Sequence, residues 1–144
     1  MIPYPYTNLG VIANRIMLNV LPDLKSEYVM SDTGMMAMLL AVMQGEMAAG
    51  IKNRMTDIDA MKGIFTDALK VIKDAGLKSD IDAVISLHPE SLSMQDVNAL
   101  HDKLSRMLIR LHEEAESGQL ERLNSDIWRY LEEHASRYVL EVPI

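Results

Sequence analysis

The amino-acid sequence predicts an all-α fold, a single-domain bundle of about five to six helices around a central apolar helix at about residues 33–55. The five prolines lie at positions 3, 5, 22, 89 and 143, which leaves the long proline-free intervals that helices require. Apolar residues recur at spacings of three and four through most of these intervals. Residues 34–50 have only Gln44 and Glu46 as polar side chains, and a helix that is apolar on every side must be surrounded.

The N-terminal part is expected to be an extended strap over residues 1–6, followed by a helix that ends at Pro22. Pro3 and Pro5 disfavour helix in the residues before them, which motivates the strap. Thr7 or Asn8 can cap the first helix. Its apolar face is formed by Leu9, Ile12, Ile16 and Val20. A loop or single turn is expected over residues 23–30.

The central helix is expected to begin after an N-cap at one of residues 31–33 and to continue past Gly50 to Met55. We expect a break at Thr56, which would cap a third helix with Ile58, Met61 and Phe65 on its apolar face. Gly76 is expected to terminate that third helix.

The C-terminal half is expected to contain three more helices. Ser79 would cap a short fourth helix, and Ser93 would cap a fifth that ends at Ser117-Gly118. The fifth helix carries the spacing of a coiled-coil seam, with Val97, Leu100, Leu104, Met107 and Leu111 on one side. The last helix covers about residues 119–138, and residues 139–144 are expected to form an extended apolar tail. No repeat or long linker divides residues 1–144, so we expect a single helical domain.

Two rows of residues along the central helix suggest a role beyond a simple core. Small residues recur every four positions and oppose a row of long apolar ones; the rows are Ala37, Ala41, Gly45, Ala49 and Met35, Leu39, Met43, Met47. Close helix packing explains both rows, since small residues let neighbours approach and methionines fill irregular gaps. The alternative is a ligand pocket lined by Met43, Met47 and Ala41. Glu46, which we expect to be buried, would then be its polar anchor.

Charge and composition exclude several classes of function. The formal net charge is −7 and no dense Lys/Arg cluster is present, so nucleic-acid binding is not expected. The absence of cysteine excludes disulfides, thiolate metal sites and cysteine catalysis. The N-terminus has neither a basic nor an apolar signal region, and we expect a cytoplasmic protein that does not cross a membrane.

No motif identifies a catalytic, metal or cofactor site. The Glu-x-x-His pairs of di-iron bundles are absent. His101 and His112 lie about 16 Å apart along one helix, so they cannot share one metal ion. Glu132, Glu133 and His134 are interpreted as a solvated face. We therefore assign no catalytic residue, no metal and no cofactor.

The function expected from these patterns is protein association, with a homodimer as the preferred form. The last two long helices and the tail carry more apolar surface than one bundle face covers, and aromatic residues are enriched at interface centres. The expected interface residues are Ile109, Trp128, Tyr130 and Tyr138. The alternative is a small-molecule-binding protein or enzyme with the Glu46 pocket described above. An adaptor for an unknown protein partner differs from the first hypothesis only in what it binds.

Overall fold

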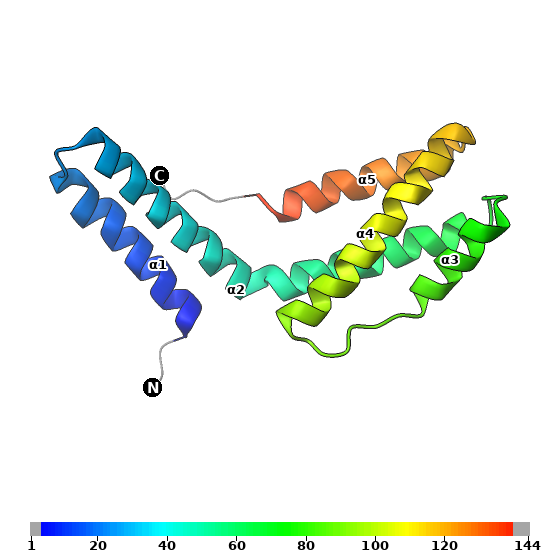
Figure 1. Ribbon diagram of the computed structural model, residues 1–144, viewed down its shortest axis with the longest axis horizontal. Coiled ribbons are helices and arrows are strands. Elements are labelled where there is room, and N and C mark those ends of the chain that lie inside the picture. The colour runs from blue at the N-terminus through cyan, green and yellow to red at the C-terminus, as the bar shows by residue number, and fades with distance from the viewer. Residues whose placement is uncertain (1–3, 140–144) are drawn as a thin grey trace. The chain divides into compact units, whose positions relative to one another are not determined.

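The structure is a computed structural model that describes residues 4–139, and it confirms the all-α prediction (Figure 1). The described chain contains five α-helices and no strand. It divides into two compact units, residues 4–50 and residues 51–139, which we describe separately. Residues 1–3 of the expected strap and 140–144 of the expected tail lie outside the described residues.

The first unit contains α1 (Pro5–Arg15), a π-helical segment η1 (Ile16–Val20), a 3-10 segment η2 (Leu21–Asp23) and the first part of α2 (Glu27–Ala68). The expected strap is wrong for Pro5 and Tyr6, which are helical. Proline suits the first helical position because its missing N–H has no intrahelical acceptor there. The expected cap at residues 31–33 is also wrong, since α2 has already begun at Glu27.

α1 and the first part of α2 form a hairpin with small residues at its contact. Gly10, Ala13 and Ala37 are buried there. A Cβ on Gly10 would lie 2.4 Å from the Gln44 Oε1 atom, so the two helices approach closely at this point. Ala37 thus plays the packing role predicted for the small-residue row.

The second unit contains the last part of α2, then α3 (Ala75–Ile85), α4 (Met94–Ser117) and α5 (Glu121–Arg137). The Ser93 side chain accepts a hydrogen bond from the Asp96 amide at 3.1 Å, which confirms the predicted cap of α4. The predicted cap at Ser79 is wrong. Asp74 caps α3 by accepting from the Leu77 amide at 2.6 Å. Gly76 therefore lies in the first turn of α3, and the prediction that it ends the preceding helix is wrong.

The break predicted at Thr56 is wrong because α2 continues without interruption to Ala68. The Thr56 hydroxyl donates to the Lys52 carbonyl at 3.0 Å, one turn earlier in the same helix. The Thr56 side chain therefore makes a hydrogen bond within α2 and does not cap a new helix. The next residue, Asp57, faces the interior of the second unit.

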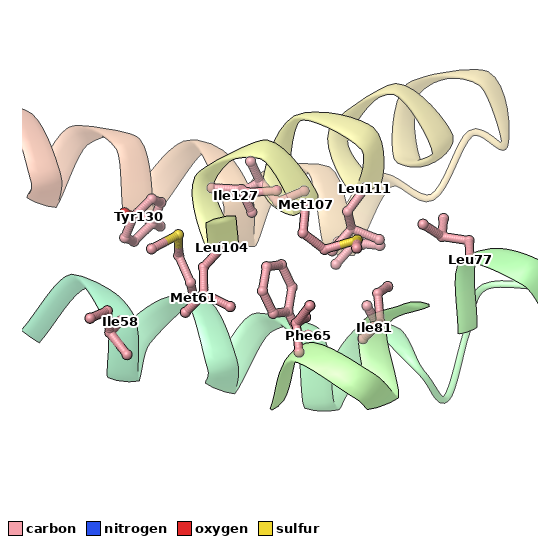
Figure 2. Close-up of a cluster of buried hydrophobic side chains, with 14 of the residues drawn as sticks. Ile58, Met61, Phe65, Leu77, Ile81, Leu104, Met107, Leu111, Ile127 and Tyr130 are labelled. Atoms are coloured by element: carbon pink, nitrogen blue, oxygen red, sulfur yellow. The ribbon is translucent and has the colours of Figure 1, made fainter. Parts of the chain in front are cut away.

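The core of the second unit lies between α2, α3, α4 and α5. Figure 2 shows Met61 and Phe65 of α2 pointing toward Leu104 and Met107 of α4. All five predicted seam residues of α4 are buried, which confirms the seam. On α5, the buried residues are Leu123, Ile127 and Tyr130.

We predict that Leu111→Ala lowers the free energy of unfolding by about 3 kcal/mol, because it leaves a cavity where the side chain is 0% exposed. Chemical denaturation measures the change. Leu92→Ala is the matched control: Leu92 is 68% exposed, and its truncation should change stability by less than about 0.5 kcal/mol. Equal effects of the two substitutions would contradict the described core.

Candidate functional site

Two features of the described chain stand out as candidate functional sites. One is a polar group inside the second unit, which we call the Asp57 cluster: Asp57, His101, His134, Arg137 and Tyr138. The other is an exposed apolar surface on the first unit, which we call the methionine surface: Met35, Met36, Leu39, Met43 and Met47.

Asp57 is a carboxylate with 0% exposure, placed by α2 on the inner face of the second unit. Removing a carboxylate from water costs several kcal/mol unless opposite charges and hydrogen bonds replace the lost hydration. Arg137 supplies the charge. Its Nε donates to Asp57 Oδ1 at 2.9 Å, and its Nη2 donates to the same oxygen.

The other carboxylate oxygen, Oδ2, faces two histidines and a tyrosine. The Tyr138 hydroxyl donates to it at 2.9 Å, and His134 Nδ1 lies 2.9 Å away. Because an ionised carboxylate only accepts, the hydrogen bond requires the proton of His134 to be on Nδ1. His101 Nε2 lies 3.5 Å from the same oxygen.

Helix geometry explains how α5 supplies three of these partners. Arg137 and the C-cap residue Tyr138 follow His134 by three and four positions, so both lie near the face of His134 at the end of α5. His134 and Arg137 also lie in the last turn, where the helix dipole favours positive charge. The Asn53 side chain of α2 donates to the Arg137 carbonyl at 3.4 Å. The cluster therefore joins the end of α5 to α2.

The rings in the cluster contact one another. His101 and His134 stack with centroids 6.0 Å apart, and His134 lies 4.7 Å from the Tyr138 ring. The Arg54 guanidinium lies over the Tyr138 ring at 5.9 Å. These contacts fix the orientation of both imidazoles toward Asp57.

The pKa of Asp57 reflects two opposing effects. Burial raises it, but hydrogen bonds from Arg137 and Tyr138 and the nearby His134 outweigh burial and bring the pKa below its usual 3.8. Tyr130, which is buried beside the cluster, has its pKa raised by burial and by the negative charge of Asp57. The cluster thus holds an ionised carboxylate next to a neutral phenol.

One atom of the cluster is not satisfied. His101 Nε2 is buried and has no hydrogen-bond partner, although it points toward Asp57 Oδ2. On the other side of the ring, Nδ1 lies 3.9 Å from Asp102 Oδ1. A buried polar atom without a partner costs about 1–3 kcal/mol and calls for an explanation.

The methionine surface lies on the side of α2 away from the α1 contact. Its five side chains are between 53% and 56% exposed. No charged residue is among them, and methionine is common on surfaces that adapt to a partner. The described chain has one helix, α2, that is long and apolar enough to cross a membrane, and 11% of its most apolar 18-residue window is buried.

The residues predicted to bind a ligand lie on the first unit. Met43 and Met47 are exposed, and Ala41 is half-buried. Glu46 is half-buried as well, so it is less buried than we expected. Of its apolar neighbours on α2, Val42 and Ala49 are half-buried, whereas Met43 and Met47 are exposed.

The predicted interface residues lie in three different environments of the second unit. Ile109 and Trp128 are more than half exposed. Tyr130 belongs to the core, and Tyr138 belongs to the Asp57 cluster. His112, on the same helix as His101, lies outside the cluster and contacts Asn124 Oδ1 at 2.9 Å.

Sequence reasoning missed Asp57 and misassigned His134 as part of a solvated face. The sequence contained a pattern that could have identified both residues. Asp57 precedes Met61 by four residues and His134 follows Tyr130 by four, so each continues the buried face of its helix. A polar residue at a core position indicates a buried interaction.

Two shallow pockets on the second unit are weaker candidates. They have volumes of about 200 and 220 Å³ and share Asp67, Leu123 and Asp126 in their walls. The acidic groups are already paired, Asp67 with Lys70 at 2.6 Å and Asp126 with Arg129 at 2.7 Å. Nothing in their lining indicates a particular ligand.

Comparison of the chain with models of known families, with curated proteins and with solved structures finds no match in any of the three. The Asp57 cluster and the methionine surface are therefore the features that indicate what this protein does.

We predict that Asp57→Asn lowers the free energy of unfolding at pH 7 by about 3 kcal/mol, because it removes the buried charge that the half-buried Arg137 guanidinium pairs with. Denaturation in metal-free buffer measures the loss. Asp59→Asn is the control, since Asp59 is exposed on the same helix.

The same pair of variants gives a pH prediction. Because folding lowers the pKa of Asp57 below 3.8, its contribution is complete well above that pH and is lost as pH falls through the lower folded-state pKa. The stability difference between the wild type and Asp57→Asn should therefore shrink between pH 5 and about pH 2.5. A difference that stays constant over this range would contradict the pairing.

Proposed function

We propose that this protein acts by association with a second copy of itself, through the methionine surface of the first unit. The observation that carries the proposal is that residues 34–50 of α2 are apolar nearly all round while α1 covers one side of them. An apolar helix face in a water-soluble protein is stable when another element covers it. A cytoplasmic location is part of the same proposal.

A second copy suits this surface better than a charged partner. The five side chains carry no charge that would select an oppositely charged surface or repel an identical one. Two helical hairpins that pack face to face form a four-helix bundle, and a twofold axis closes the assembly. The flexible side chain of methionine can repack against its own copy.

Glu46 constrains how two copies of α2 meet. It is the one charged residue between positions 33 and 50. If the helices cross antiparallel near Leu39, each Glu46 lies seven residues from the crossing point, and the two carboxylates are about 21 Å apart. Repulsion across that distance is largely screened. We therefore place the twofold axis near Leu39.

The ligand-pocket alternative has less support. Met43 and Met47 are exposed side chains on a convex helix face, whereas small-molecule sites are concave and enclose most of the ligand. An interface on the second unit around Ile109 and Trp128 would use fewer exposed apolar residues.

We predict that Leu39→Cys forms a disulfide-linked dimer on mild oxidation, because residues near a twofold axis face their own copies. The chain has no cysteine, so the introduced thiol is the only one. Ala83→Cys, at an exposed position on α3, is the control and should form at least about tenfold less dimer. Non-reducing electrophoresis measures the yield.

Light scattering of the unmodified protein provides an independent test. We expect a dimer at micromolar concentration, a monomer for Leu39→Glu and an unchanged dimer for Leu92→Glu. A monomeric wild-type protein would contradict self-association. A monomer that also floats with lipid vesicles would instead assign α2 to a membrane.

A further inference from the structure

We propose that Asp57, His101 and His134 bind a divalent transition metal ion, with zinc the ion that best fits the donors. The three ligand atoms are Asp57 Oδ2, His101 Nε2 and His134 Nδ1. All three lie within 4.8 Å of one another, and they come from α2, α4 and α5.

Two of the three distances between donors lie close to those of a tetrahedral site. Zinc binds nitrogen and carboxylate oxygen at about 2.0–2.1 Å, so neighbouring donors of a tetrahedron are about 3.3 Å apart. Asp57 Oδ2 lies 2.9 Å from His134 Nδ1 and 3.5 Å from His101 Nε2, on either side of that value. The third pair, His101 Nε2 and His134 Nδ1, lies within 4.8 Å, so small side-chain movements would place an ion between the three atoms.

The unsatisfied His101 Nε2 atom supports the proposal independently. It is buried, makes no hydrogen bond and points toward the carboxylate oxygen that would share the ion. The lone pair of a neutral imidazole is a preferred zinc ligand. A bound ion would satisfy this atom and remove the cost of its burial.

The surroundings resemble the outer shell of a metal site. Arg137 binds Asp57 through Oδ1 and leaves Oδ2 for the ion, while the Tyr138 hydroxyl lies 2.9 Å from Oδ2. Asp102 lies beside the other nitrogen of His101, where metal-bound histidines usually meet a carboxylate.

Charge sets the expected strength of the site. The Arg137 guanidinium neutralises the single carboxylate ligand and repels a cation, so binding should be weaker than at a carboxylate-rich site. Binding through His134 Nδ1 also displaces the proton that this atom otherwise donates to Asp57, and in a neutral imidazole that proton moves to Nε2. We expect one zinc ion per chain with a Kd of about 1–10 µM at pH 7.5, a free energy near −7 to −8 kcal/mol.

The experiment is a calorimetric titration of the full-length, chelator-treated protein with zinc chloride. We expect 1:1 binding. His101→Ala should weaken binding by at least about 100-fold, since even outer-shell losses cost 10–100-fold. Because His101 Nε2 has no partner in the metal-free protein, this variant should keep its fold, and circular dichroism checks that it does.

His112→Ala is the matched control, because His112 lies on the same helix and outside the cluster. It should bind zinc as tightly as the wild type. Cobalt substitution adds a spectroscopic readout: a tetrahedral site gives intense visible bands, which should be absent in His101→Ala. Zinc binding that is unsaturable, weaker than about 100 µM or equal in His101→Ala and the wild type would overturn the proposal.

Discussion

The ion pair between Asp57 and Arg137 is the interaction on which the second unit depends. It places a full negative charge where no water reaches it, and the arginine, a tyrosine hydroxyl and a histidine replace the lost hydration. Apolar contacts in the core hold α5 and the second-unit part of α2 together, but apolar contacts alone do not fix how far one helix is shifted along the other. A carboxylate with directional partners fixes one register between the two helices.

The two units use opposite kinds of surface. The second unit buries the Asp57 carboxylate together with most of its large apolar side chains in its interior. The first unit is a hairpin, and two helices alone have no interior in which α2 can bury all of its faces. Because α2 belongs to both units, one helix changes along its length from an exposed apolar surface to a packed core element.

Sequence periodicity predicted the helical class and the buried seam of α4, since side-chain spacing reports which residues share a face. Helix boundaries were predicted less well. Ser93 was one of few cap candidates at its position, whereas Thr56 had a competing use inside α2. The Asp57 cluster was missed because its members come from three helices more than thirty residues apart. Spacing along a chain shows a residue's face but does not show which residues meet that face.

The methionine content of the first unit has a chemical consequence. Oxidation turns a thioether into a sulfoxide, a polar group that enzymes can reduce again. Met61 and Met107 are shielded within the core of the second unit, whereas Met35, Met36, Met43 and Met47 are open to small oxidants. Peroxide would therefore reach the exposed thioethers first and make that face of α2 polar, while the second unit kept its fold.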